Sequence, residues 1–295
     1  MGRLHSRHSA CTGDAQPMKI KFGLFTRLQF ALLAIISPQR LVTAITAGFL
    51  SAVDSLEDDE LRMLVEEIND AVDSRFQVGV LSQTKDPATL CWQAMHQDYS
   101  EGWVFYDEPL NEADAGDRIV KHLLLGGRGH YGPLEHASIT FAVGYFPHSV
   151  IQQARTHRVG TSWDVQSMRY TGKRIAGVVD GIVDVEEAFY LRPVGDYTNR
   201  QGKKYTYDER LRAKDLQCCE DSSRRYKEAL DAGISEEHAR GVLPFDYRQH
   251  FVVTFNLRSL MHFLDLRGKA DAQIEIHQMC QLMMPHFENW IHPSR

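Results

Sequence analysis

The chain has 295 residues, of which 43% are hydrophobic and 24% are charged, as in a soluble globular protein with one large domain or two small ones. Its net charge is −6 and its isoelectric point is about 6.2, which argues against a nucleic-acid binder driven by overall positive charge but allows a local basic pocket. The five cysteines form no C-x-x-C pair, which argues for a reducing compartment and against a disulfide framework or a zinc site.

Residues 1–53 form a basic, acid-poor extension, with six lysines and arginines against a single acid, Asp14. Its longest apolar run, residues 30–36, is too short to span a bilayer, so we expect no membrane segment there. The composition is typical of an organelle transit peptide, and equally of an untranslated upstream stretch if synthesis begins at Met18 or later. We expect a cytoplasmic protein, with organellar import left open.

The next segments lead into a compact mixed domain that we expect to span residues 76–295. Acids alternate with apolar residues over 54–76, which predicts one amphipathic helix, with 54–75 as a helix or linker outside the domain. Residues 76–81 alternate as in a strand, and Pro87 opens a helix that ends near Gln97. A second helix is predicted over 117–125, where two glycines close it.

Two histidines and a glutamate follow within seven residues, in the stretch from His130 to His136. These residue types can bind a metal, but the spacing matches neither H-E-x-x-H nor a paired finger pattern. His136 alone is better explained as a capping or core residue. His130 lies beside glycines, which allow a flat ligand to approach the backbone closely.

Residues 138–145 are the clearest strand of the sequence, and Pro147 begins a helix that we expect to carry residues 153–158. There Gln153, Thr156 and His157 have the spacing of one helical face. The stretch from Gln153 to Gly172 reads QARTHRVGTSWDVQSMRYTG and crowds basic, imidazole and hydroxyl groups together. Such groups bind phosphates, so we interpret this stretch as an anion-binding core.

The second half of the chain supplies a further basic segment. A glycine- and valine-rich passage extends to about residue 185, a polar loop is predicted over 195–207, and a long charged helix over 208–230. Ser235 caps a helix that delivers Arg240. Residues 251–255 form a buried strand, after which Asn256 starts a helix that ends at Gly268.

That helix contains Arg258, His262 and Arg267. Arg258 and Arg267 are nine residues apart, about half a rotation, so one flat ligand cannot easily touch both. Either the last turn is distorted, or the two arginines serve different ligands or different subunits. A long final helix over 271–290 has a Met-rich stripe that we assign to packing.

These segments together resemble the flavin-dependent thymidylate synthases. The core stretch resembles the family signature, in which R-H-R is followed, after seven residues, by S-x-R-Y. The other matches fall in the same order: GHYGPLEH, RGVLP, NLRSLMHFLDLR and AQIEI. The resemblance covers residues 76–291 and nothing before them.

The resemblance implies an α+β fold with a central antiparallel sheet flanked by helices, assembled into homotetramers with shared active sites. It implies synthesis of dTMP from dUMP, with methylenetetrahydrofolate as one-carbon donor and FAD passing on the hydride of NADPH. It further implies that the partners are dUMP and other copies of the chain, with no nucleic acid, membrane or metal. No cysteine lies in a basic, glycine-framed setting, which agrees with a reaction that needs no thiolate nucleophile.

Roles carry over by position. The resemblance assigns dUMP binding to Gln153, Arg155, Thr156, Gln166, Ser167, Met168, Arg169, Arg240 and Arg267. It assigns FAD binding to His130, Gly132, Thr156, His157, Arg158, Asn256, Arg258 and His262. Arg267 is the expected catalytic residue, because a permanent cation beside the uracil favours its ionised N3 and raises electron density at C5.

The sequence departs from the family pattern at several positions. Thr156 replaces the first arginine of the signature, with Arg155 one position earlier, and eight residues separate Arg158 from Ser167 where seven is usual. These departures leave two alternatives open. The first is a catalytically impaired nucleotide-binding relative, and the second is a metal-dependent hydrolase built on His130, Glu135 and His136.

Overall fold

The structure is a computed structural model, and it describes residues 73–125, 130–199, 201–269 and 271–291. The extension over 1–53 and nearly all of the helix predicted over 54–76 lie outside the described residues. That helix does not reach Phe76, because residues 73–76 form a turn in which the N–H of Phe76 donates to the carbonyl of Asp73 at 2.9 Å. No helix of the described ranges is long and apolar enough to cross a membrane.

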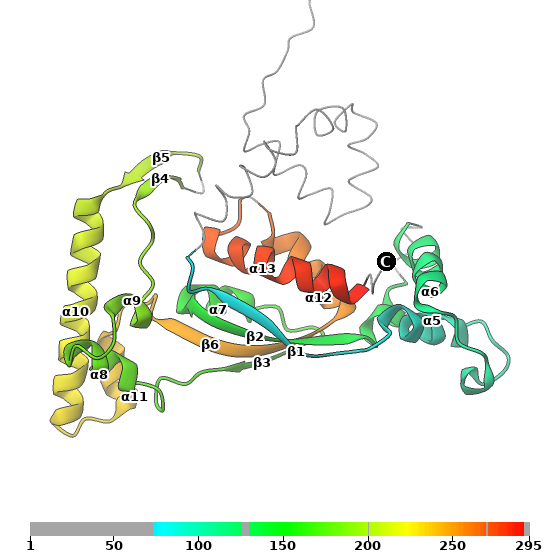
Figure 1. The fold of residues 1–295 in the computed structure, drawn as a ribbon, viewed down its shortest axis with the longest axis horizontal. Helices are drawn as coiled ribbons and strands as arrows, with labels where there is room; N and C mark the ends of the chain where they lie inside the picture. Colours follow the sequence, from blue (N-terminus) through cyan, green and yellow to red (C-terminus); the bar gives the residue numbers. More distant parts are fainter. Residues whose placement is uncertain (1–72, 126–129, 200, 270, 292–295) are drawn as a thin grey trace, which may run out of the picture.

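A four-stranded antiparallel sheet in the order β1-β2-β6-β3 forms the centre of the fold (Figure 1). The strands are β1 (Gln77–Gln83), β2 (Ser138–Pro147), β3 (Thr161–Val165) and β6 (Arg248–Asn256). β2 and β6 pair from Ser138 opposite Asn256 to Pro147 opposite Arg248. Burial alternates along both strands, as expected where one face is covered and the other open.

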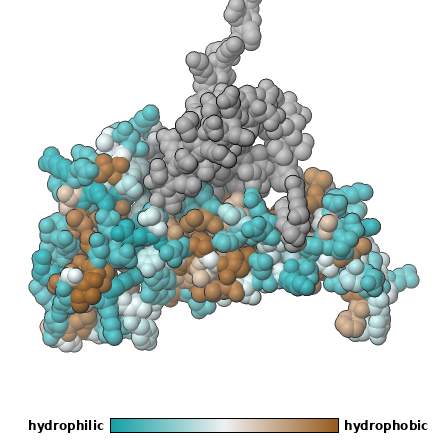
Figure 2. Space-filling model, in the orientation of Figure 1, coloured by the Kyte–Doolittle hydropathy of each residue, from teal (hydrophilic) through white to brown (hydrophobic). Residues whose placement is uncertain are grey.

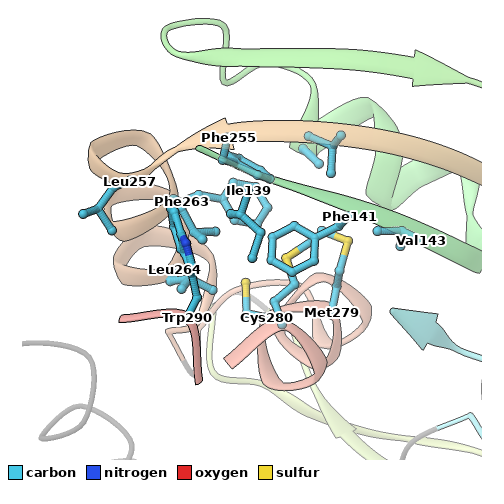
Figure 3. Close-up of a cluster of buried hydrophobic side chains, with 14 of the residues drawn as sticks. Ile139, Phe141, Val143, Phe255, Leu257, Phe263, Leu264, Met279, Cys280 and Trp290 are labelled. Carbon is cyan, nitrogen blue, oxygen red and sulfur yellow. The ribbon is translucent and has the colours of Figure 1, made fainter. Parts of the chain in front are cut away.

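Three helices lie over one face of the sheet (Figure 1): α7 (His148–Ala154), α12 (Leu257–Arg267) and α13 (Ile274–Ile291). Apolar side chains from β2, β6, α12 and α13 meet beneath them (Figure 3). We call this cluster the main core. It includes Ile139, Phe141, Val143, Phe255, Phe263, Leu264, Met279, Cys280 and Trp290. The helices therefore bind the sheet through the hydrophobic effect.

A second apolar cluster, the small core, gathers at the left end of the sheet in Figure 1. It is built by α8 (Lys173–Val179), α9 (Val185–Ala188), α10 (Glu209–Asp231), α11 (Glu236–Ala239) and the segments that join them. Its buried members are Met168, Ile175, Ala188, Phe189, Leu191, Cys219, Tyr226 and Ala239. Figure 2 shows hydrophobic side chains over this end and over the middle of the molecule, separated by hydrophilic areas.

The opposite end of the molecule carries α5 (Pro87–Gln97) and α6 (Glu112–Ile119), which is prolonged by a π-helical turn (Val120–Leu124). Shorter 3₁₀ turns occupy Val104–Tyr106, Gly132–Glu135 and Arg240–Val242. A separate two-stranded hairpin is formed by β4 (Gly195–Thr198) and β5 (Lys204–Tyr207).

Arg248 joins the sheet to the segments around the small core. Its guanidinium is fully buried and donates to the carbonyls of Glu186, Phe189 and Tyr145, and it forms an ion pair with Asp73. A buried charge is tolerated only when its donors are satisfied in this way. These contacts of Arg248 fix the start of β6 against α9.

The predicted α+β class with a central antiparallel sheet is confirmed, and several element predictions are corrected. Residues 195–207 are the β4–β5 hairpin rather than a loop, and the glycine- and valine-rich passage contains α8. α6 begins at Glu112, earlier than predicted, because Asn111 caps it by accepting from the N–H of Asp114 at 3.0 Å. α7 ends at Ala154, so residues 155–158 leave the helix that we predicted for them.

Candidate functional site

His157, in the loop that follows α7, contacts Arg267 at the end of α12. The Nε of Arg267 donates to the Nε2 of His157 at 3.1 Å, so the imidazole is neutral and carries its proton on Nδ1. Burial lowers the pKa of His157, and the charges of Arg267 and His262 lower it further. The rings of His157 and His262 lie 5.7 Å apart. This group joins one predicted dUMP contact to two predicted FAD contacts.

Gln153, at the end of α7, is held by α13 and the segment before it. Its Nε2 donates to the Oε1 of Gln273, whose own Nε2 donates to the Oε2 of Glu275 at 2.7 Å. Glu275 is buried and pairs with Arg192 at 2.8 Å. Thr156 is fixed near Gln153 because its hydroxyl donates to the Gln153 carbonyl at 2.7 Å. Hydrogen bonds therefore hold Gln153 and Thr156 in place at the end of α7.

The loop from His157 to Thr161 is clamped to the start of α12. The N–H of Asn256 donates to the carbonyl of Gly160 at 2.9 Å, and the Ser259 hydroxyl donates to the carbonyl of Val159 at 2.7 Å. Asn256 also caps α12 by accepting from the N–H of Ser259 at 2.8 Å. Gly160 has a φ of 66°, which a residue with a Cβ adopts only with strain.

Arg258 lies in a different neighbourhood from Arg267. It forms an ion pair with Glu135 and stacks over the ring of Tyr131, with the guanidinium carbon 5.8 Å from the ring centroid. α12 remains an α-helix through Arg267, so its last turn is not distorted. Within one chain the two arginines therefore have different neighbours, as their spacing on the helix predicts.

Arg169 and Arg240 lie around one carboxylate at the small core. The Nη1 of Arg169 pairs with Glu237 at 2.5 Å, and this contact is the main cause of the lowered pKa of Glu237, to which the charge of Arg240 also contributes. Met168 and Ala239, the neighbours of the two arginines, are both buried in the small core. Two guanidiniums around one exposed carboxylate form a site suited to a phosphate.

A shallow concavity of about 380 Å³ opens beside Arg240. It is lined by His148, Glu237, Arg240, Gly241, Leu243, Phe245 and Tyr247. Phe245 and Tyr247 supply aromatic rings to its wall, and Arg240 and Glu237 are the charged residues of opposite sign that line it.

Gln166, Ser167 and Met168 form the segment between β3 and Arg169. The N–H of Gln166 donates to the carbonyl of His250 at 2.9 Å, which continues the pairing of β3 with β6. Met168 is 1% exposed and anchors the segment from below, whereas Ser167 is partly exposed. The structure thus brings the predicted residues 166–169 into one fixed turn.

The remaining predicted residues lie apart from these groups or open to solvent. His130 contacts Asp98 at 3.1 Å, Arg155 and Arg158 are exposed, and a Cβ at Gly132 would meet nothing within 4 Å. Within the described ranges no three His, Cys, Asp or Glu side chains lie close enough to hold a metal ion. Glu135, a ligand in the hydrolase alternative, is engaged by Arg258.

One chain therefore assembles the predicted site in two parts. Gln153, His157 and Arg267 are linked through the end of α7, the loop after it, the end of α12 and the segment before α13, whereas Arg169 pairs with Glu237 of α11, a helix at the left end of Figure 1, and Arg240 directly follows that helix. Our sequence reasoning missed Glu237 and Gln273, which contact the predicted residues. Gln273 stands inside the AQIEI match and could have been assigned a role, whereas Glu237 resembles any acid in the first turn of a helix.

Comparison with known proteins gives one family match and several close relatives. The family described as thymidylate synthase complementing protein matches residues 79–294. The flavin-dependent thymidylate synthase of Halobacterium salinarum is 36% identical over 228 residues, which are 72% of this chain and 91% of that protein. The protein of the same name from Haloarcula marismortui is 34% identical over 231 residues, with the same coverage of 72% and 91%.

Two solved structures share the fold. A UMP/dUMP methylase from Streptomyces cacaoi, bound with 5-Br dUMP, superposes with a TM-score of 0.57 at 24% identity, covering 74% of this chain and 92% of that chain. Thymidylate synthase X from Helicobacter pylori, with FAD and dUMP, superposes with a TM-score of 0.53 at 19% identity, covering 70% and 91%. At these identities the likeness shows the fold alone.

Proposed function

Because this chain belongs to the thymidylate synthase complementing protein family, we propose that it synthesises dTMP from dUMP, with residues 76–295 as the catalytic domain. The one-carbon donor is methylenetetrahydrofolate, and NADPH supplies the reducing equivalents. When bound, FAD passes the hydride of NADPH to the methylene group. The observation that supports the proposal most directly is that Arg169 and Arg240 both lie near Glu237, because two guanidinium groups near one carboxylate are suited to binding a phosphate on the segments that the signature predicts.

The described residues fit FAD. Arg258 and Arg158 supply guanidinium groups for a pyrophosphate, and His157 and His262 supply imidazole edges for a flat ring system. Open space next to Gly132 leaves its backbone accessible to a ligand. We therefore assign FAD binding to His130, Gly132, Thr156, His157, Arg158, Asn256, Arg258 and His262.

The nucleotide is proposed to bind with its phosphate between Arg169 and Arg240, where it takes the place of Glu237 as partner of Arg169. We assign the rest of dUMP to Gln153, Arg155, Thr156, Gln166, Ser167, Met168 and Arg267. The cation of Arg267 stabilises the uracil ionised at N3, which raises the electron density at C5 where the new bond forms. His157 keeps the Arg267 guanidinium in place by accepting from its Nε.

The cysteines support a reaction without a thiolate nucleophile. Burial raises the pKa of Cys91 to about 11 and that of Cys219 to about 12, and it raises the pKa of Cys280 as well. A buried thiol with a raised pKa is a poor nucleophile. Cys218 is exposed on α10.

The split site supports assembly into a homotetramer. We propose that Arg169 and Arg240 of one subunit meet Arg267 of another, so that each site is completed by contact between copies of this chain. The open face of the sheet, which carries small and polar residues such as Thr140 and Thr254, leaves room for such a contact. We place the enzyme in the cytoplasm, with organellar import left open by the basic extension over residues 1–53.

The test is purification of the full-length chain followed by an assay. The protein should be yellow and show flavin absorption, and it should form dTMP from dUMP when both methylenetetrahydrofolate and NADPH are added. Omission of either should abolish the product. A colourless protein that FAD does not reconstitute, or one that is loaded with flavin and forms no dTMP, would contradict the proposal.

A further inference from the structure

Three hydrogen bonds connect the start of α7 to the segment that precedes Ser167. The Nε2 of Gln152 contacts the Nε2 of His148 at 2.6 Å, the Nδ1 of His148 contacts the Oε1 of Gln249 at 2.5 Å, and the Nε2 of Gln249 donates to the carbonyl of Gln166 at 2.7 Å. We call Gln152, His148 and Gln249 the relay. It runs from α7 through β6 to the predicted nucleotide-binding turn.

Only one protonation state of His148 completes the relay. The amide nitrogen of Gln152 can only donate, so the Nε2 of His148 must accept. The Oε1 of Gln249 can only accept, so the Nδ1 of His148 must donate. Both conditions hold for the neutral imidazole with its proton on Nδ1. Each of the three hydrogen bonds is then donated toward Gln166, from Gln152 to His148, from His148 to Gln249 and from Gln249 to the Gln166 carbonyl. A doubly protonated ring would lose the bond from Gln152.

The surroundings of His148 favour this neutral form. Its ring stacks on Tyr247 at 4.8 Å and meets Phe245 edge to face at 5.2 Å. Burial is the main cause of the lowered pKa of His148, and the charge of Arg155 lowers it further, whereas the bond to Gln249 and the charge of Asp246 oppose these effects. Arg240 and Glu237 line the same concavity as His148.

The last bond of the relay determines the direction of a peptide group. Because a trans peptide is planar, its carbonyl and its N–H point in opposite directions. Gln249, which is 2% exposed, holds the Gln166 carbonyl on β6. The N–H of Ser167 therefore points away from Gln249. Backbone N–H groups fixed in this way are effective donors to phosphate oxygens.

We propose that the relay is a positioning device for dUMP binding, in which neutral His148 keeps Gln249 oriented and thereby fixes the Gln166–Ser167 peptide for the nucleotide. His148, Gln152 and Gln249 are positioning residues, because they act through Ser167 rather than on the substrate. The inference rests on the proposed function and adds to it that His148 and Gln249 contribute to dUMP affinity without contacting the nucleotide.

The test measures dUMP binding to the full-length, FAD-loaded chain by calorimetry. H148F keeps the ring stack and removes both nitrogens, and Q249M keeps the volume and removes the donor. We expect each variant to bind dUMP roughly 3- to 10-fold more weakly, raising KM more than it lowers kcat, with an unchanged flavin spectrum.

The comparison of dUMP affinity with flavin binding separates positioning from a general loss of structure. A variant that only loosens the fold should lose flavin and kcat together with dUMP affinity. Dissociation constants of H148F and Q249M equal to that of wild type would overturn the proposal, and so would a loss of dUMP affinity matched by an equal loss of flavin.

Two further variants, H96F and Q152L, serve as a control and as a second test. H96F is the matched control, since His96 also stacks on an aromatic ring, Trp92 at 4.9 Å, and contacts a side chain, Asp107 at 3.1 Å, but lies on α5. It should bind dUMP as wild type does. If H148F and Q249M fail to fold, Q152L at the start of the relay should still weaken binding, and unchanged binding would overturn the relay. Wild type that binds FAD but no dUMP would refute the proposed function as well.

Discussion

Arg267 combines two tasks in one side chain, since it faces the predicted uracil position and holds His157 through its Nε. We expect R267A to lower the rate of dTMP formation by roughly 10- to 100-fold, as the loss of a charged hydrogen bond implies, while FAD binding falls much less. Single-turnover kinetics and flavin titration measure the two effects. R267K, which keeps the charge, should retain part of the activity. Unchanged turnover in R267A would remove Arg267 from catalysis.

Arg169 is the second residue whose loss should be specific. R169A should weaken dUMP binding by about 1.5 to 3 kcal/mol, because a charged contact to the phosphate disappears. Calorimetric titration with dUMP measures this loss. R224A is the matched control, since Arg224 is similarly exposed and pairs with Asp221 within α10. Equal affinities of R169A and R224A would place the phosphate elsewhere.

At the scale of elements, the clamp between the 157–161 loop and α12 depends on Gly160. A Cβ there would overlap the side chains of Asn256 and Ser259, at a residue whose φ is already 66°. We expect G160A to lower the free energy of unfolding by about 3 kcal/mol or more and to weaken FAD binding, because strain and overlap add. Urea unfolding and flavin titration measure both.

Gly181 provides the control for this prediction. It has the same φ of 66°, but a Cβ there would meet nothing within 4 Å. G181A should therefore show backbone strain alone, about 1 kcal/mol, with normal FAD binding. If G160A and G181A lower the free energy of unfolding equally, overlap with the side chains of α12 and its cap is not the reason that position 160 requires a glycine.

The sequence predicted the elements with strong local signals. Pro87 at the first position of α5, the alternation along β2 and the Asn256 cap of α12 all depend on neighbouring residues, and the structure confirms these elements. β3 and the β4–β5 hairpin were missed because many of their residues are polar, and because β3 pairs with a strand distant in the sequence and β4 pairs with β5 across a turn. Such pairing leaves little trace in a single strand.

The residues of the candidate site also fall into those that the sequence predicted and those that only the structure reveals. The motif residues were found because the resemblance to the family supplied them, and the structure groups Arg169 with Arg240 and His157 with Arg267. Gln249 and His148 could not be found from sequence, since a histidine and a glutamine a hundred residues apart form a relay only after β2 and β6 have paired.

At the scale of the whole molecule, the division of the site predicts complementation between inactive subunits. R169A and R267A should each be nearly inactive alone. After joint refolding, random assembly should restore roughly a quarter of wild-type activity, because some sites then combine an intact Arg169 with an intact Arg267 from another subunit. A dTMP assay before and after mixing measures this. Absence of any recovery would indicate that one chain carries the whole site.

The buried histidines predict how stability depends on pH. Burial lowers the pKa of His148, His157, His250 and His277 below the ordinary value of 6.5. The unfolded chain therefore binds more protons than the folded chain as the pH falls below 6.5, so the free energy of unfolding decreases through that range. Solvent screens these partly exposed rings, and we expect a loss on the order of 1 to 2 kcal/mol.

Urea unfolding at about pH 8 and about pH 5 measures the loss. H148F should show a smaller difference between the two conditions, because one of the four rings no longer titrates. Identical unfolding midpoints for wild type at both values would contradict the assignment of neutral buried imidazoles.

The separation of the hydrophobic interior into two clusters has a consequence for release of the product. The small core contains Met168 and Ala239, the residues next to the two arginines that we propose as phosphate partners, whereas the start of α12, which holds the 157–161 loop, packs in the main core. A partial opening limited to α8, α10 and α11 would move both arginines and leave the sheet intact. On the proposed function, we expect the nucleotide to leave through such a local opening while the cofactor stays bound.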